Sequence, residues 1–131
     1  MQPMRIIVYL WSLPTTMLGL LFVPLAIFTG GAADWIDGVL EIHGPAIRFL
    51  LTYCTVMRGG ASAITLGHVV LGRDRQALEL TRRHERIHVR QCERWGPLFI
   101  PVYLLASIFV MLLGRRAYMD NPFEREAYAK Q

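Results

Sequence analysis

The sequence predicts an α+β membrane protein with one N-terminal transmembrane helix, a short pair of strands and a mostly helical core. Three observations lead to this fold class. Hydrophobic residues make up 53% of the chain and charged residues only 18%, which is more apolar than a typical soluble domain. The apolar residues gather in two segments, 4–28 and 98–114. Between them lie short β-branched stretches and one long amphipathic stretch, which indicate strands followed by a helix.

Residues 6–28 form the predicted transmembrane anchor. A helix of this length can cross the hydrocarbon core of a bilayer, which is ~30 Å thick. Pro14 and Pro24 would kink the helix, which transmembrane helices tolerate. A signal peptide is the alternative, but its apolar region is usually only ~7–15 residues long. We therefore divide the chain into a membrane anchor, residues 1–30, and a small domain, residues 31–131.

The next part of the chain has the character of strands. Residues 38–45 and 61–72 are short, β-branched and bounded by glycine or proline, as strands tend to be. The apolar run 46–57 between them is compatible with a strand or a helix, because a short apolar run does not distinguish the two. Arg58–Gly60, with the sequence RGG, is predicted to be a turn.

Residues 74–95 are predicted to be a helix, with Asp74 as its N-cap and a stop at Gly96-Pro97. One face of this helix collects the less polar residues, which we expect to be buried: Leu80, His84, Ile87, His88, Gln91, Cys92 and Trp95. The opposite face collects arginines, which we expect to face solvent or lipid headgroups: Arg82, Arg83, Arg86, Arg90 and Arg94. A last helix is predicted over 123–130, after Asn121-Pro122.

The predicted long helix carries a possible zinc site. His84, Glu85 and His88 form the pattern H-E-x-x-H, in which two histidines four residues apart can direct ring nitrogens at one ion. Glu85 would flank the metal and act as general base towards a water. Cys92 is too far along the helix to share the ion, since ~12 Å of helix rise separates it from His84. His43 and His68 are weaker candidates for a further ligand, and a pair of structural histidines is the simpler alternative.

The tail supplies a better third ligand by resemblance. The sequence NPFEREAYA contains E-x-x-A, and H-E-x-x-H followed by E-x-x-A resembles the gluzincin class of zinc metallopeptidases. The nearest branch is that of the membrane-bound heat-shock peptidase and the CAAX prenyl protease. The resemblance implies a zincin-like core in residues 31–131, with Glu124 as third zinc ligand. It also implies that an edge strand within 64–72 pairs with an extended substrate. Tyr128 stands where that class has an aspartate.

This reading constrains the second apolar segment. If residues 98–114 crossed a bilayer, ~30 Å of hydrocarbon would separate His88 from Glu124. We therefore expect 98–114 to be a core helix or a membrane-dipping helix that packs against the helix 74–95 and returns the chain to the metal.

Two functions remain open at this point. The first is a membrane-bound zinc metallopeptidase in a bacterial inner or plasma membrane, with lipid around it and a peptide or membrane-protein segment as substrate; which side carries the domain stays undecided. The alternative is a non-catalytic accessory or structural subunit of a larger membrane complex. Nucleic acid is not expected, because the net charge of +4 comes without an aromatic-interleaved basic run or a phosphate loop. Cys54 and Cys92 could pair, although two free thiols are the simpler reading.

Overall fold

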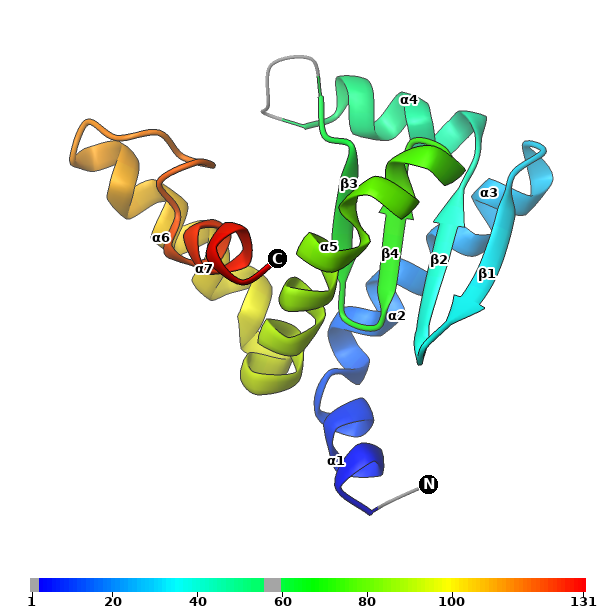
Figure 1. Ribbon diagram of the computed structural model, residues 1–131, viewed down its shortest axis with the longest axis horizontal. Coiled ribbons are helices and arrows are strands. Elements are labelled where there is room, and N and C mark those ends of the chain that lie inside the picture. The colour runs from blue at the N-terminus through cyan, green and yellow to red at the C-terminus, as the bar shows by residue number, and fades with distance from the viewer. Residues whose placement is uncertain (1–2, 56–59) are drawn as a thin grey trace.

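The structure, a computed structural model, describes residues 3–55 and 60–131. A four-stranded mixed sheet lies at its centre, with helices on both faces (Figure 1). The strands are β1 (Ala32–Ile36), β2 (Val39–His43), β3 (Ala63–Leu66) and β4 (Val69–Gly72). The helices are α1 (Pro3–Trp11), α2 (Leu13–Leu20), α3 (Phe22–Phe28), α4 (Pro45–Tyr53), α5 (Arg75–Trp95), the 3-10 helix η1 (Gly96–Leu98), α6 (Phe99–Leu112) and α7 (Pro122–Lys130). The predicted α+β class is confirmed.

The sheet consists of two hairpins, β1–β2 and β3–β4, joined by parallel pairing of β2 with β4. Each hairpin turns at a glycine with positive φ, Gly38 (82°) and Gly67 (65°), a conformation that favours glycine. The sheet is therefore larger than the predicted strand pair. Strand β1, with the sequence AADWI, lacks the β-branched run on which the prediction relied, and the predicted strand segment 61–72 contains a whole hairpin.

Helix α4 connects the two hairpins. Parallel strands cannot be joined by a tight turn, so a crossover helix is the usual solution. The apolar run 46–57, for which strand and helix were both open, is helical as far as Tyr53. Residues 56 and 57 of that run, and Arg58 and Gly59 of the predicted turn, lie outside the described residues.

The N-terminal apolar segment is three short helices instead of one straight helix. The pair Arg5–Trp11 and Leu13–Phe28 is bent by 65°. Helices α2 and α3 pack on one face of the sheet, where a Cβ added to Gly19 would lie only 2.6 Å from Val69 Cβ. The segment is thus packed against the rest of the fold. The division of the chain into a membrane anchor, residues 1–30, and a small domain, residues 31–131, stays a prediction.

The core lies on both sides of the sheet because neighbouring residues of β4 point to opposite faces. Val69 and Leu71 pack with Ala26, Ile42 and Ile47 in the cluster that contains residues of α3 and α4. Val70 packs with residues of α5 in a second cluster, whose buried members are Val39, Val70, Leu78 and Val89. All four residues of β4 are buried, as expected for a central strand.

Helix α5 lies across the face of the sheet opposite α2 and α3, and α7 lies beside it (Figure 1). The Asp74 side chain caps α5 by accepting a hydrogen bond from the Ala77 amide at 2.7 Å. After α6, the chain folds back along that helix: Ser107 Oγ donates to Ala117 O at 2.9 Å, and Asn121 Nδ2 donates to Ser107 Oγ at 2.7 Å. This return brings α7 to α5, as the sequence required.

By length and composition alone, one described helical stretch could cross a membrane, and a second if the bent N-terminal pair is counted as one span. The first is Arg75–Leu112, whose most apolar window has a mean hydropathy of 2.0 and is only 17% buried. In α6 only Phe99 and Val110 are buried. The expectation that residues 98–114 form a core helix or a membrane-dipping helix stays a prediction.

Candidate metal centre

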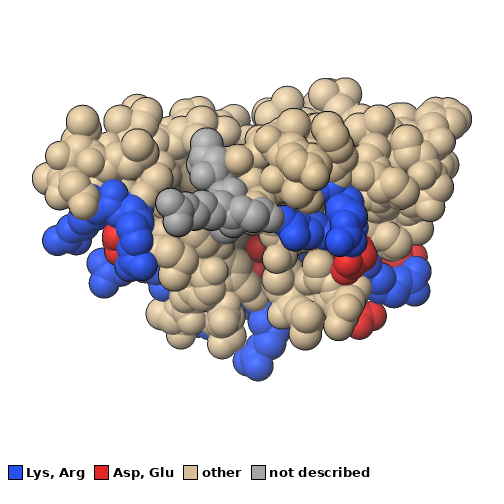
Figure 2. Space-filling model, turned by 90° about the horizontal axis from the view of Figure 1, so that it is seen from above, with Lys and Arg blue, Asp and Glu red and all other residues tan. Residues whose placement is uncertain are grey.

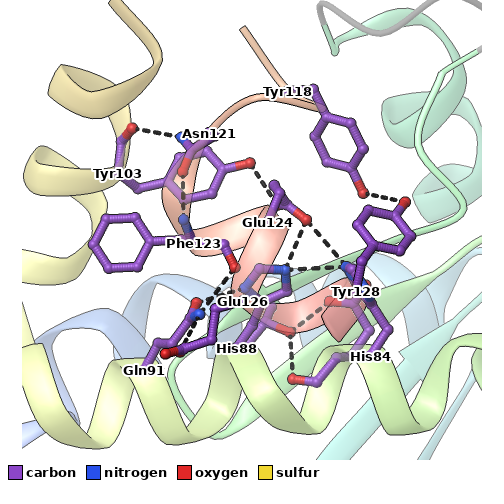
Figure 3. Close-up of polar contacts among 12 residues, drawn as sticks. His84, His88, Gln91, Tyr103, Tyr118, Asn121, Phe123, Glu124, Glu126 and Tyr128 are labelled. Atoms are coloured by element: carbon purple, nitrogen blue, oxygen red, sulfur yellow. Dashed lines mark hydrogen bonds and ion pairs between the residues drawn. The ribbon is translucent and has the colours of Figure 1, made fainter. Parts of the chain in front are cut away.

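Three side chains from α5 and α7 meet in the interior (Figure 3). Glu124 Oε1 lies 3.0 Å from His84 Nε2 and 3.0 Å from His88 Nε2, and the two Nε2 atoms are 3.2 Å apart. His84, His88 and Glu124 are 7%, 5% and 4% exposed. One ligand atom from each lies within 4.8 Å of the others, so the group could hold a metal ion. The structure thus brings together the three residues predicted as zinc ligands.

A buried glutamine fixes which nitrogen of His88 carries the proton. Gln91 Nε2 donates to Phe123 O at 3.0 Å and to Glu126 Oε1 at 2.8 Å, and both partners are acceptors only. The amide oxygen must therefore face His88 Nδ1, which lies 2.8 Å from Gln91 Oε1. Because an oxygen only accepts, His88 Nδ1 carries the hydrogen. The lone pair of the neutral ring is then on Nε2, the atom directed at Glu124.

His84 and Glu124 are held in similar ways. His84 Nδ1 lies 2.8 Å from Gln131 Oε1, so its Nε2 is also directed into the group. The hydroxyl of Tyr103, in α6, donates to Glu124 Oε2 at 2.6 Å and leaves Oε1 for the histidines. Asn121 caps α7 by accepting from the Phe123 amide at 2.9 Å, which places Glu124 in the first turn of that helix.

The electrostatics of the group call for a positive charge at its centre. Burial alone would raise the pKa of Glu124, but His84 and His88, when their rings are protonated, lower it to about 2. Burial alone would lower the pKa of both histidines, but Glu124 raises it. Three electron-pair donors within hydrogen-bonding distance repel one another unless a proton or a metal ion lies between them. Two imidazoles and one carboxylate are also the ligand set of a common class of catalytic zinc site, so the residues fit the ion.

Glu85, the predicted general base, lies next to this group but is not part of it. The residue is 6% exposed, and its Oε2 accepts a hydrogen bond from Thr65 Oγ1 at 2.7 Å. Burial raises the pKa of Glu85, against the lowering effect of His88 and the Thr65 hydroxyl. Thr65 belongs to β3, an edge strand of the sheet. The Glu85 side chain thus extends from α5 to the strand that is predicted to bind substrate.

The other candidate ligands lie elsewhere. His68 Nε2 is 2.9 Å from Glu93 Oε2, and its ring stacks on Tyr9 with the centroids 3.9 Å apart. His43, in β2, does not belong to the group either. Both cysteines are free, Cys54 exposed and Cys92 buried, so they do not form a disulfide. Burial raises the pKa of the Cys92 thiol to about 12, consistent with a packing role.

The predicted faces of α5 are correct only in part. Arg82 and Arg86 do not face solvent as expected: Arg82 forms two hydrogen bonds of 2.9 Å with the buried carboxylate of Glu41, and Arg86 Nη2 lies 3.0 Å from the same carboxylate. Leu80, expected on the buried face, is 78% exposed. The prediction of the two faces failed because helical periodicity gives the direction of the buried face but not how many residues it includes. In addition, the buried carboxylate of Glu41 on β2 attracts the nearest arginines.

The sequence analysis missed Gln91 and Tyr103 as partners of the site. Gln91 was placed on the buried face, three residues after His88, and that spacing was a usable signal. Nothing local marks Tyr103, which reaches Glu124 only because α6 folds back. Tyr118 and Tyr128, considered below, form a hydroxyl pair at 3.1 Å, and the Tyr128 ring lies 4.3 Å from the His84 ring.

Comparison with models of known families finds none that matches this chain, and neither a curated protein nor a solved structure matches it. The fold and the site therefore define a class only coarsely: an α+β chain with a buried His–His–Glu group that could hold a metal ion.

Proposed function

We propose that this chain is a membrane-bound zinc metallopeptidase whose substrate is a peptide or a membrane-protein segment. One observation carries the proposal: the Nε2 atoms of His84 and His88 and an oxygen of Glu124 converge in the interior, while Gln91 holds the proton of His88 on the opposite nitrogen. This arrangement leaves lone pairs directed at a common point. The order of H-E-x-x-H before E-x-x-A supports the same reading.

In this proposal His84, His88 and Glu124 hold the ion. When bound, zinc supplies Lewis-acid chemistry and makes water acidic enough to lose a proton near neutral pH. Glu85 would serve as the proton acceptor at its carboxylate, which Thr65 Oγ1 positions through a hydrogen bond. Strand β3 lies at the edge of the sheet among the described residues, and an extended peptide can add there as a further strand. The Tyr118 and Tyr128 hydroxyls are the candidates for stabilising the oxyanion.

Metal analysis and a peptidase assay test the proposal together. The purified chain is expected to bind about one zinc ion, the stoichiometry of a three-ligand site. Glu85→Gln is expected to retain the zinc and lose ~10²–10⁴-fold of the activity, the usual contribution of a general base. Glu79→Gln, an exposed change on the same helix, is the matched control. Full activity in Glu85→Gln would rule out its role as the base.

A non-catalytic accessory subunit of a membrane complex is the second candidate, and one observation favours it. Two cavities among the described residues, of about 320 and 310 Å³, are lined by residues other than His84, His88 and Glu124. The Tyr128 ring and Gln131 also lie directly against His84. A peptidase would need α7 to shift its last turn to admit substrate, whereas a structural metal site would not. A zinc-loaded chain without peptidase activity would support the subunit.

A further inference from the structure

Most of the exposed large hydrophobic side chains of the described residues lie on two segments, α1–α3 and η1–α6. Those of the first are Ile6, Ile7, Leu10, Trp11, Leu13, Met17, Leu18, Leu20, Leu21, Leu25, Ile27 and Phe28. Those of the second, with the residue after α6, are Leu98, Leu104, Leu105, Ile108, Phe109, Met111, Leu112 and Leu113. In the view of Figure 2 the charged side chains gather along one side of the molecule and leave the opposite side apolar. Soluble monomers seldom expose an apolar patch above ~600 Å².

Helix α5 is the reference against which these segments can be placed. Exposed arginines occur from its first turn to its last: Arg75, Arg83, Arg90 and Arg94. A helix of 21 residues is ~32 Å long. With charges spread along that whole length, no part of α5 can lie in hydrocarbon, because each buried charge is costly there. Any residue bonded to α5 is therefore on the same side of a membrane as α5.

Residues at both ends of the first apolar segment form ion pairs with α5. Arg5 Nη1 lies 3.9 Å from Glu93 Oε2, in the last turns of α5, and its guanidinium sits 5.5 Å above the Tyr9 ring. After the segment, Asp34 Oδ2 lies 3.6 Å from Arg75 Nη2, at the first turn of α5. The segment starts and finishes on the side of α5, so it does not cross.

The second apolar segment behaves in the same way. It begins directly after α5, and the chain that follows it is bonded back to α5 through Glu124 and the two histidines. Helix α6 has 14 residues, a length of ~21 Å against a hydrocarbon core of ~30 Å. Helix α6 is therefore both too short to cross and returned to its starting side.

The charged residues near these two segments indicate that a lipid bilayer covers their exposed apolar side chains. Arginines lie at the start of the first segment (Arg5) and at both ends of the second (Arg94 before it, Arg115 and Arg116 after it), while Asp34 and Asp37 follow the first. Arginines at these positions favour binding to an anionic membrane surface. A net charge of +4 has the sign that phosphate headgroups attract.

We propose that α1–α3 and α6 are embedded in one leaflet of an anionic phospholipid bilayer without crossing it, and that α5 and the metal centre lie on the water side. This inference replaces the span expected over residues 6–28 by an in-plane attachment. It rests on the membrane association of the proposed function, but not on zinc or on peptidase activity.

Three variants, each with one accessible cysteine, test the topology. In a full-length Cys54→Ser background, one cysteine is placed in a short N-terminal extension, one at Arg83 on α5 (Arg83→Cys) and one at Arg125 on α7 (Arg125→Cys). Cys92 stays, because it is buried. Right-side-out and inverted vesicles are treated with a membrane-impermeant maleimide. We expect all three cysteines to be labelled in the same type of vesicle. Labelling of the N-terminal cysteine opposite to that of Arg83→Cys overturns the inference, as does opposite labelling of Arg125→Cys.

Two matched leucines test the lipid contact. Leu105 on α6 is 64% exposed and Leu80 on α5 is 78% exposed, so neither change should disturb the core. With purified chain and phosphatidylglycerol-containing vesicles, Leu105→Glu is expected to weaken binding at least about tenfold, as expected for a charge in hydrocarbon. Leu80→Glu should leave binding unchanged. Equal effects overturn the inference. If the unmodified chain does not bind vesicles at all, membrane association itself is refuted. This outcome differs from a crossing topology, which the cysteine labelling would detect.

Discussion

Two buried histidines of this chain, His88 and His68, each face a glutamate at almost the same distance, 3.0 Å to Glu124 and 2.9 Å to Glu93. They are 5% and 3% exposed. Their surroundings differ. His88 has a second histidine 3.2 Å away, whereas His68, in the turn between β3 and β4, stacks on Tyr9 of α1.

The comparison shows what distinguishes a possible metal site from a structural ion pair. The Gln91 amide fixes the proton of His88 on Nδ1, so its Nε2 faces other lone pairs. The Nδ1 atom of His68 is buried without a hydrogen-bond partner among the described residues. His68 can thus place its proton on Nε2 and donate it to Glu93, and this pair is complete without an ion. Both histidines are buried and lie near a carboxylate. Only at His88 do several lone pairs converge on one point.

The largest expected difference between the two regions is in bound metal. His88→Ala removes one of three ligands, and we expect the purified chain to lose its zinc. His68→Ala should retain zinc and instead lower the free energy of unfolding by ~1–3 kcal/mol, the usual cost of removing a buried, bonded side chain. Metal content by elemental analysis and denaturant unfolding measure the two effects. Equal zinc loss in both variants would show that the triad is not the site.

Gln91 gives the next largest effect. Gln91→Leu removes the acceptor that holds the His88 proton on Nδ1, and outer partners of metal ligands typically contribute ~10–100-fold in metal affinity. We expect a loss in that range in competition with a zinc chelator, and a change in the nitrogen chemical shifts of His88 in the metal-free chain. Gln76→Leu, at an exposed position of the same helix, is the control. A weaker affinity with unchanged His88 shifts would mean that Gln91 acts only by holding α7.

The sequence could predict the local parts of this architecture and not the long-range ones. Asp74 and Gly96 mark the ends of α5, and the spacing of His84 and His88 puts both on its buried face, because caps and helical periodicity are local properties. Glu124 was found through a motif. By contrast, the sequence around Tyr103 does not predict its hydrogen bond to Glu124, since that contact forms only because the chain after α6 folds back along the helix. Strand β1 escaped notice because its partner, not its composition, makes it a strand.

Tyr103→Phe is expected to have a smaller effect than Gln91→Leu. It removes only the hydrogen bond to Glu124 Oε2, while the ring keeps its packing against Phe99 and Phe123. Without this bond the carboxylate can rotate, and we expect about a tenfold loss of zinc affinity, the lower end of the range for outer partners. Unfolding of the metal-free chain should change by ~1 kcal/mol or less. An unchanged zinc affinity would show that α7 alone positions Glu124.

The smallest expected effect belongs to the His68 region and depends on pH. The hydrogen bond from His68 lowers the pKa of Glu93, so the folded chain favours the ionised carboxylate more than the unfolded chain does. Such a group contributes stability above its unfolded pKa of ~4.3, and the contribution disappears as the pH falls through the lower folded value. We therefore expect Glu93→Gln to reduce the free energy of unfolding by ~1 kcal/mol at pH 7, since the carboxylate is partly exposed. The difference from the unmodified chain should shrink steadily below pH ~4.3, while Glu79→Gln shows no such trend. A difference that persists undiminished at pH ~3 would mean that Glu93 stabilises the fold by packing and not by its charge.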